Sequence, residues 1–332
     1  MMNGATAALS IRTIIPQTRP HWVGNGFHVF PVFQNLAFSN SISPFLMLDY
    51  AAPKDFPPGK GKRERRGVGQ HPHRGFETVT IAFQGEVEHG DSVGNHDVIG
   101  PGDVQWMTAA RGIIHEEYHS ESFSEAGGTF EMVQLWVNLP AKHKMDAPRY
   151  QAILNASIPE VHVPAAHEQE YKEVEVTGND AVDSGVTSKT TAAAKVRLIA
   201  GSFRRSVGPA NTHTPIDLWD VLLPAAEVPV ELEMKPGHNV IVFSRQGSVR
   251  VGEGGNTAEL GPQSVAILET VGKNKGDGHV LRLMATQPNT KLLILAGEPL
   301  DEPIAARGPF VMNTNEEIMQ ANADYRSGRM GR

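Results

Sequence analysis

The amino-acid sequence predicts an all-β protein, built as two antiparallel β-barrels of the jelly-roll type with a short C-terminal helix. Short runs rich in β-branched and aromatic residues recur along the 332-residue chain, and 33 glycines and 23 prolines supply turns between them. The second half repeats the rhythm of strand and turn seen in the first half, which indicates a duplicated barrel. The sequence contains no dinucleotide-binding glycine fingerprint and no phosphate-binding loop.

Strand signals are dense in the first half of the chain. Residues 51–70 are expected to form a loop, because prolines, glycines and basic residues follow one another there. Residues 150–154 could make a helical turn. The expected strands are 12–15, 27–33, 45–50, 78–83, 85–90, 97–99, 104–107, 111–118 and 131–138.

A polar segment separates the two halves. Residues 177–195 are poor in apolar side chains and rich in Ser, Thr, Gly, Asp and Ala, which is typical of a flexible linker or exposed loop. We therefore expect an N-terminal barrel over 1–150, a connecting segment over 151–195 and a C-terminal barrel over 196–332. The strands expected in this last part are 196–199, 218–223, 228–234, 239–243, 248–251, 264–268, 280–285 and 291–296.

The end of the chain carries the signals of one helix. Thr314 and Glu317 have the spacing of a capping box, in which side chains and backbone groups satisfy each other at a helix start. Ile318 and Tyr325 fall on one face of this helix, and Gly328 can end it. We expect the helix to pack on the outside of a barrel.

The composition excludes several classes of protein. The formal net charge is −7, which argues against direct nucleic-acid binding because such proteins carry a basic surface. Cysteine is absent, so the chain has no disulfide, no thiolate metal ligand and no cysteine nucleophile. The first residues do not read as a signal peptide and no apolar stretch is long enough for a membrane span, so we expect a cytoplasmic protein.

Two short motifs carry the functional interpretation. His71 and His73 are two residues apart, so their side chains leave the same face of an extended strand. His115 and Glu117 repeat this arrangement further along the chain, whereas Glu116 should point to the opposite face. Alternating histidines can be ordinary surface residues, but two such motifs on antiparallel strands of one barrel could bring all four side chains to a single metal ion.

The second half of the chain has neither motif. His213, His238 and His279 stand alone in the sequence, and we interpret each as a surface or hydrogen-bonded residue rather than a metal ligand. We therefore expect one metal site per chain, in the first barrel.

A basic cluster precedes the first histidine motif. The simpler interpretation is a solvated loop, and the alternative is a contact for an anion or a protein partner beside the metal site, to which the loop leads. The cluster consists of Lys60, Lys62, Arg63, Arg65 and Arg66.

Longer stretches around these motifs resemble the pirin family, whose members are bicupin proteins of two stacked β-barrels. The resemblance runs from about residue 10 to the end of the chain and is weakest over 177–195. The stretches that carry it are His71-Pro-His-Arg-Gly-Phe-Glu-Thr78, Pro101-Gly-Asp-Val-Gln-Trp-Met-Thr108, Arg111-Gly-Ile-Ile-His-Glu-Glu117, Gln134-Leu-Trp-Val-Asn-Leu139 and Gly308-Pro-Phe-Val-Met-Asn-Thr-Asn-Glu-Glu-Ile318.

The resemblance implies a ligand set and a metal. Pirins bind one iron in the N-terminal cupin barrel through three histidines and one glutamate. Carried over by motif, the ligands here are His71, His73, His115 and Glu117. The implied metal is Fe(II), one ion per chain, and the same ligand set could take Mn, Co, Ni, Cu or Zn.

The general cupin pattern bears on two further positions, Glu77 and His119. In that pattern the first histidine strand also supplies a glutamate, here Glu77, which strand parity places on the inward face as well. Glu117 ranks first as the ligand because pirin-like motifs place the carboxylate two residues after the last histidine. The general pattern has an asparagine where this chain has His119, which we treat as a bystander or outer-shell group.

Some pirins are similar to quercetin 2,3-dioxygenases, which open the ring of a flavonol with dioxygen. For this chain the resemblance implies a flavonol substrate, with Glu117 or Glu77 as the general base that accepts the flavonol proton. Gln134 lies on the inward face of its strand and would hydrogen-bond the substrate or orient a ligand; a core amide satisfied by backbone is an equal alternative. Phe76 is expected to pack in the barrel.

The competing expectation is a protein without enzymatic activity. Pirins of higher organisms look like transcription co-regulators whose surface responds to the oxidation state of iron, and a partner of a metabolic enzyme is a further alternative. A regulatory role needs a partner surface, for which the basic residues at 60–66 are the best candidate. Functions diverge on one fold, so the resemblance predicts the metal and the barrels more firmly than the substrate.

Overall fold

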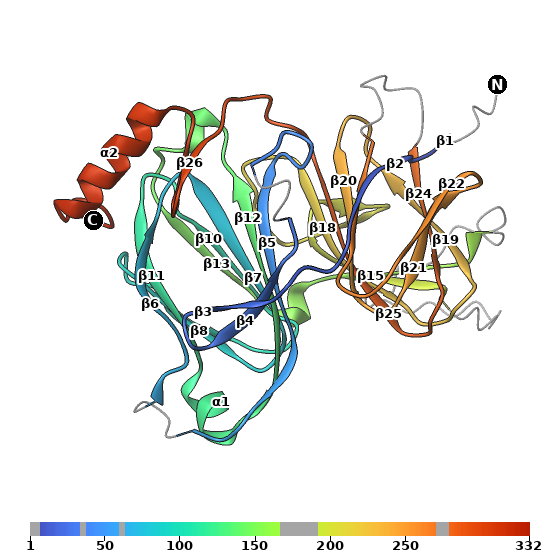
Figure 1. Ribbon diagram of the computed structural model, residues 1–332, viewed down its shortest axis with the longest axis horizontal. Helices are drawn as coiled ribbons and strands as arrows, with labels where there is room; N and C mark the ends of the chain where they lie inside the picture. The colour runs from blue at the N-terminus through green and yellow to red at the C-terminus, as the bar shows by residue number, and fades with distance from the viewer. Residues whose placement is uncertain (1–6, 34–37, 60–63, 167–191, 270–278) are drawn as a thin grey trace, which may run out of the picture. The chain divides into compact units, whose positions relative to one another are not determined.

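The chain folds into two compact units that consist mainly of β-strands (Figure 1). A computed structural model describes residues 7–33, 38–59, 64–166, 192–269 and 279–332. The first barrel comprises Gln17–Ile158, Pro209–Ile216 and Gly297–Arg332, and the second barrel comprises Met1–Pro16, Pro159–Gly208 and Asp217–Ala296. Among the described residues, no helix has the length and apolar character needed to cross a membrane.

The first barrel is made of a large and a small antiparallel sheet. Within the described residues, the large sheet has the strand order β13-β10-β7-β12-β5-β4-β3, and the small sheet has the order β6-β11-β8-β9. The strands of the large sheet are β3 (His21–Val23), β4 (Phe27–Pro31), β5 (Phe45–Phe56), β7 (Phe76–Gln84), β10 (Val104–Thr108), β12 (Gly128–Asn138) and β13 (Arg149–Ile153). The strands of the small sheet are β6 (Gly67–His73), β8 (Val87–Asp91), β9 (His96–Ile99) and β11 (Ile113–His119).

Shorter elements complete the first barrel. Helix α1 precedes β12, and helix α2 follows a small hairpin near the C-terminus (Figure 1). These elements are α1 (Glu121–Ala126), the 3₁₀ turns η2 (Ala141–His143) and η3 (Asn155–Ser157), the hairpin strands β26 (Ala305–Arg307) and β27 (Phe310–Met312), and α2 (Asn315–Arg326).

The second barrel repeats this two-sheet construction. In the described part of the chain, one sheet has the order β14-β15-β18-β25-β20-β23-β2 and the other the order β1-β24-β21-β22, with β19 also paired to β24. The first of these contains β2 (Ile11–Ile15), β14 (Glu160–Val163), β15 (Ala194–Ala200), β18 (Ile216–Leu223), β20 (Asn239–Gln246), β23 (Val265–Leu268) and β25 (Thr290–Gly297). The other contains β1 (Ala7–Ala8), β19 (Pro229–Met234), β21 (Val249–Glu253), β22 (Asn256–Leu260) and β24 (His279–Ala285), and β16 (Ser202–Phe203) with β17 (Ser206–Val207) forms a separate hairpin.

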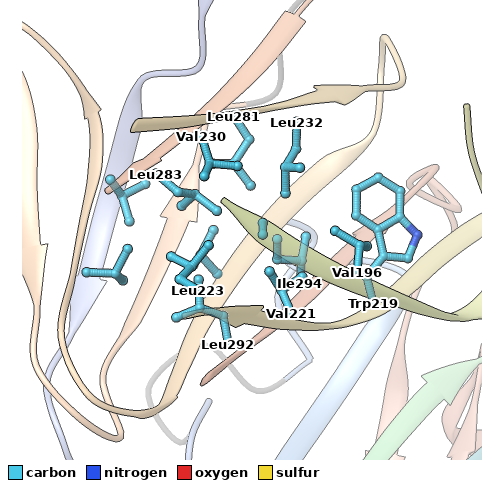
Figure 2. Packing of buried hydrophobic residues seen from close by; sticks show 14 of the residues in the cluster. Val196, Trp219, Val221, Leu223, Val230, Leu232, Leu281, Leu283, Leu292 and Ile294 are labelled. Atoms are coloured by element: carbon cyan, nitrogen blue, oxygen red, sulfur yellow. The ribbon is translucent and has the colours of Figure 1, made fainter. Parts of the chain in front are cut away.

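Alternate residues of these strands build the apolar interior of the second barrel (Figure 2). On β18, for example, Trp219, Val221 and Leu223 point into the same cluster, as the period of two in a strand requires. Leu281 and Leu283 do the same on β24. Complete burial of each such side chain stabilises the fold by about 1.5–3 kcal/mol. The cluster drawn in Figure 2 includes Val196, Trp219, Val221, Leu223, Val230, Leu232, Leu281, Leu283, Leu292 and Ile294.

The two ends of the chain belong to different units than the predicted boundaries suggest. Near the N-terminus, β1 pairs with β24 and β2 pairs with β23, all within the second barrel. The C-terminal residues 297–332 belong instead to the first barrel. The predicted segments 1–150 and 196–332 therefore differ from these contact units at both ends of the chain, because strand pairing between distant segments leaves no local sequence signal.

Helix α2 begins where the capping signal predicts. Thr314 is the N-cap, its side chain accepts a hydrogen bond from the Glu317 backbone, and the Glu317 side chain caps in return. Ile318 and Tyr325 are seven residues apart in this continuous helix and so fall on one face, but Ile318 is buried whereas Tyr325 is 41% exposed. The buried face of the helix carries Ile318 and Ala321.

Several local predictions are corrected by strand pairing. Residues 150–154 are not a helical turn, because Arg149–Ile153 pairs antiparallel with Val104–Thr108 along its whole length. The predicted loop 51–70 is shorter than expected, because β5 continues to Phe56 and β6 starts at Gly67. Helix α1 and strand β22 were not expected from the sequence. Most of the predicted linker 177–195 lies outside the described residues.

Candidate metal centre

Three histidines meet on β6 and β11 of the small sheet. The register places His115 directly opposite His71, and Ile113 opposite His73. The imidazole centroids are 4.3 Å apart for His71 and His115, 4.9 Å for His73 and His115, and 4.8 Å for His71 and His73. One ligand atom of each histidine lies within 4.8 Å of those of the other two, so the three side chains could hold one metal ion.

The hydrogen bonds of these imidazoles leave ring nitrogens available to bind a metal ion. Both ring nitrogens of His115 and Nδ1 of His73 are buried without a hydrogen-bond partner. Nδ1 of His71 donates to the carbonyl oxygen of Gly69 over 2.8 Å, and this bond leaves the lone pair of Nε2 free. Buried polar atoms normally have partners, and a bound cation would supply one here.

Burial keeps two of these histidines neutral. It lowers the pKa of His73 to about 3, with a further contribution from the neighbouring His71. It also lowers the pKa of His115 well below the ordinary value, and the surrounding histidines act in the same direction. A neutral imidazole is the form that binds a metal, so no proton has to be displaced from these two side chains near neutral pH.

Glu117 follows His115 by two residues on β11 and is held by three side chains. Its Oε1 accepts hydrogen bonds from Oγ1 of Thr80 at 3.2 Å and Nε2 of Gln105 at 3.1 Å. Its Oε2 accepts one from Nε2 of Gln134 at 2.8 Å. The group whose ligand atoms lie within 4.8 Å of one another consists of the three histidines and does not include Glu117. The assignment of Glu117 as the carboxylate ligand therefore stays a prediction.

The residues around Glu117 form a row across the large sheet. Gln105 pairs with Thr80, Thr80 with Gln134, and Gln134 with Asp49, so these side chains share one face of four neighbouring strands. Asp49 is buried, its Oδ1 has no hydrogen-bond partner, and burial raises its pKa to about 7. Of this row, only Gln134 was singled out from the sequence; the others become visible once the strand register is known.

Glu77 does not share this face, and the parity argument for it is wrong. Gly75, with a φ of +88°, lies between β6 and β7, which belong to different sheets, so the alternation that starts at His73 does not continue. Glu77 pairs in register with Thr108 and accepts a hydrogen bond from its Oγ1 over 2.6 Å. It lies three positions from Thr80 and therefore on the opposite face of β7. Burial raises the pKa of Glu77 to about 7.

The turn after His73 is fixed by a buried lysine. Nζ of Lys144 donates to the carbonyl oxygens of Gly75 at 2.7 Å and Val311 at 3.0 Å, and to Oδ1 of Asn138 at 2.6 Å. Burial lowers the pKa of Lys144 to about 7. These contacts tie the turn to β27, and they place the backbone that carries His73.

His89 is a further buried histidine, which no motif in the sequence indicates. Its Nδ1 lies 3.3 Å from Nε2 of Gln105, and its Nε2 lies 3.1 Å from Oδ2 of Asp91. Its ring stacks on Tyr150 with a centroid distance of 4.8 Å. A chain of contacts therefore runs from Asp91 through His89 and Gln105 to Glu117. His89 lacks a neighbouring histidine two residues away, so spacing gives no signal for it.

Aromatic side chains border the histidines. The rings of Phe76 and Trp136 lie 4.2 Å apart, and each is close to His73, at 5.1 Å and 5.3 Å. Phe76 is fully buried and packs against Leu46 and Val311, as expected for a core residue.

His119 and Glu116 lie away from the three histidines. His119 is buried against the rings of Phe56 and Phe130, at 4.7 Å and 4.3 Å, and its Nε2 donates to the Gly26 carbonyl oxygen. Burial lowers the pKa of His119 to about 4. Glu116 is partly exposed and faces Arg65 at 3.7 Å, on the opposite side of β11 from His115.

Two described residues of the basic cluster, Arg65 and Arg66, contact other residues of the first barrel. Arg65 contacts Glu88 at 3.0 Å and lies over the ring of Tyr118 at 3.7 Å. Arg66 donates to the carbonyl oxygen of Pro57. Residues Lys60, Lys62 and Arg63 lie outside the described residues.

The isolated histidines of the second half have different surroundings. His238 and His279 are buried, at 8% and 3% exposure, so the surface interpretation is wrong for both. Neither belongs to a potential metal-ligand group among the described residues. His213 lies in the first barrel, where its ring centroid is 4.7 Å from that of His143, so it does not stand alone.

Comparisons with known proteins agree with this architecture. Residues 26–137 match the Pirin family, and residues 218–331 match the family described as the Pirin C-terminal cupin domain. A Pseudomonas aeruginosa protein named "Putative quercetin 2,3-dioxygenase" is 48% identical over 93% of this chain and 94% of its own length. The pirin of Mus musculus is 32% identical over 88% of this chain and 84% of its own length.

A solved structure matches nearly the whole chain. The crystal structure of quercetin 2,3-dioxygenase from Acinetobacter baumannii has a TM-score of 0.81 and 41% sequence identity. The match covers 97% of this chain and 98% of that one, so it includes both cupin domains.

Proposed function

Because the chain belongs to the pirin family, we propose that it is a mononuclear non-haem iron protein with quercetin 2,3-dioxygenase activity. The observation that carries this proposal is the group formed by His71, His73 and His115. Its imidazoles are close enough for one ion, and those of His73 and His115 keep buried nitrogens without hydrogen-bond partners. The similarity to proteins named as quercetin 2,3-dioxygenases supports a flavonol as substrate and dioxygen as co-substrate.

In this proposal His71, His73, His115 and Glu117 hold the metal, most simply Fe(II), while Mn, Co, Ni, Cu and Zn fit the same nitrogen and oxygen donors. When bound, such an ion supplies the Lewis acidity that acidifies a flavonol hydroxyl and the redox chemistry that dioxygen requires. Thr80, Gln105 and Gln134 orient the Glu117 carboxylate by the hydrogen bonds described above.

Asp49 suits the task of accepting the flavonol proton. It lies directly opposite Gln134 in the strand register, and its Oδ1 has no competing hydrogen-bond donor. A carboxyl with a pKa near 7 can both take up and return a proton at neutral pH. Asp49 therefore replaces Glu77, which lies on the other face of β7, as the alternative to Glu117 for the general base.

The activity test uses protein loaded with Fe(II) under anaerobic conditions. Quercetin and air are then added, and the loss of the flavonol absorbance is followed. We expect turnover that is absent in His71→Ala, and bound iron is measured in both proteins. Full iron occupancy in the natural sequence with no turnover above the His71→Ala rate would contradict the dioxygenase proposal and favour a redox-responsive regulatory protein.

A further inference from the structure

A second group of potential metal ligands lies outside the three-histidine centre. It consists of His143, Asp146 and His213, and one ligand atom of each lies within 4.8 Å of those of the other two. The imidazole rings of His143 and His213 have centroids 4.7 Å apart and planes inclined by 44°. Nδ1 of His143 lies 2.7 Å from Oδ2 of Asp146. All three residues belong to the first barrel, although His213 is far from the others in sequence.

The backbone holds His143 and Asp146 in place. His143 ends the turn η2, in which its backbone N–H donates to the Pro140 carbonyl oxygen at 2.8 Å. The Asp146 N–H donates to the carbonyl oxygen of His143 at 3.2 Å, and the Asp146 carbonyl oxygen accepts from the Arg111 N–H at 3.1 Å. These bonds close a turn in which side chains three residues apart point to one side, and the two ligands are preorganised.

The segment that carries His213 is fastened to β13. The carbonyl oxygen of Asn211 accepts hydrogen bonds from Arg149 at 2.8 Å and Gln151 at 3.0 Å. The Asn211 N–H donates in return to Oε1 of Gln151 at 2.9 Å. His213 is thus fixed two residues after a doubly anchored backbone, which reduces the entropy that metal binding would have to remove.

We propose that His143, Asp146 and His213 bind a divalent transition-metal ion of the zinc type, at a second site on the first barrel. Two imidazoles and one carboxylate are common protein ligands of zinc, and water can complete the coordination. The side chain of His143 is 30% exposed and that of Asp146 is 48% exposed, so an ion can enter from solvent.

The local charges are compatible with this site. Burial, Arg149 and His143 lower the pKa of His213, whereas Asp146 raises it. The Asp146 carboxylate supplies negative charge next to both imidazoles. Arg149 opposes a cation electrostatically, but its guanidinium is engaged with the Asn211 carbonyl oxygen.

A bound ion would join the turn after β12 to the segment before β18. Because these segments are distant in sequence, the ion would stabilise the folded chain in proportion to its occupancy. The three-histidine centre would not be needed for this effect, which separates the proposal from the dioxygenase activity.

The test is zinc binding to full-length, tag-free, chelator-treated protein, measured by titration calorimetry in a His71→Ala background that weakens the first centre. We expect one zinc ion per chain in this background. Adding His213→Ala or Asp146→Asn should weaken that binding by at least about tenfold, the loss that even an outer-shell change causes at a metal site.

His162→Ala is the matched control, because His162 also pairs with a carboxylate, Glu160 at 2.8 Å, but has no third ligand nearby among the described residues. It should leave zinc binding unchanged. Circular dichroism of every variant shows whether the fold is kept. Zinc binding of equal strength in folded His213→Ala and Asp146→Asn proteins would overturn the proposal.

Discussion

Gln134 donates a hydrogen bond from Nε2 to Oε2 of Glu117 over 2.8 Å, from the large sheet of the first barrel to the small one. The other carboxylate oxygen is held by Thr80 and Gln105, which also lie on the large sheet. The orientation of Glu117 relative to His115 on its own strand is therefore set by the opposing sheet. In the proposed metal centre, residues that touch no metal would therefore affect the affinity for the ion.

Gln134→Leu should weaken Fe(II) binding by roughly 10–100-fold, the usual cost of removing an outer-shell partner. The change leaves Oε2 of Glu117 without its donor while the three histidines remain. The measurement is iron affinity by equilibrium dialysis. Gln84→Leu is the matched control, because Gln84 donates to Glu131 at 3.0 Å in the same sheet but not to Glu117. Equal losses in the two variants would show that the Gln134 contact has no specific role.

Asp49→Asn should stabilise the metal-free protein above neutral pH. The folded-state pKa of Asp49 is raised from 3.8 to about 7 by burial, so the carboxyl ionises later in the folded protein than in the unfolded chain. The Asp49 carboxyl therefore contributes a loss of stability as the pH rises from about 4 to about 7, and the variant lacks this contribution. At pH 8 we expect an advantage on the order of 2–4 kcal/mol in the free energy of unfolding.

Urea unfolding of metal-free Asp49→Asn and natural protein at pH 4 and pH 8 measures this difference. Asp55→Asn, at the exposed end of the same strand, is the control and should leave the change in stability between the two pH values as in the natural protein. An Asp49→Asn advantage that is equal at both pH values would contradict the assignment to ionisation.

Lys144→Met should destabilise the protein by about 2–4 kcal/mol, because three buried oxygens lose their common donor. Since one of these oxygens belongs to Gly75, the affinity for iron should fall as well. Thermal unfolding and iron binding are measured in parallel. The neighbouring Lys142 is exposed, and Lys142→Met should change neither the thermal stability nor the iron affinity. If the two variants behave alike, the buried ammonium group of Lys144 is not responsible for the losses.

Gly75→Ala should unfold the first barrel or cost more than about 3 kcal/mol. The residue has a φ of +88°, and a Cβ atom there would lie 1.9 Å from the carbonyl oxygen of Val311. Gly94→Ala separates the cost of backbone strain from the cost of the close contact, because Gly94 has a φ of +100° but no atom within 4 Å of the position of an added Cβ. Gly94→Ala should cost only about 1 kcal/mol, measured by urea unfolding. Similar costs for both would mean that backbone strain, not the close contact, dominates at Gly75.

Strand parity predicted those parts of the site that lie within one strand. His71 and His73 share a face because β6 is continuous through both, and Gln134 faces inward as expected from the alternation along β12. The capping spacing of Thr314 and Glu317 was similarly reliable, since both partners lie within one helical turn.

Strand parity gave a wrong prediction for a residue that follows a turn. It gave no prediction for contacts between segments that are distant in sequence. Glu77 was misplaced because the turn at Gly75 resets the alternation, and nothing in the spacing of the residues reveals the φ of that glycine. Asp49 could not be found because its position depends on the register between β5 and β12. His213 was taken as isolated, although a long-range contact brings it to His143.

The discontinuous first barrel has a consequence for synthesis of the chain. Residues 17–158 leave the ribosome before β27 and α2, which belong to residues 297–332. Val311 in β27 and Asp324 in α2 contact Lys144 and Arg74, next to His73, at 3.0 Å and 2.9 Å. At a translation rate of about 5–20 residues per second, the nascent barrel waits on the order of ten seconds for them. We therefore expect the proposed iron centre to be completed only after residues 297–332 have been synthesised.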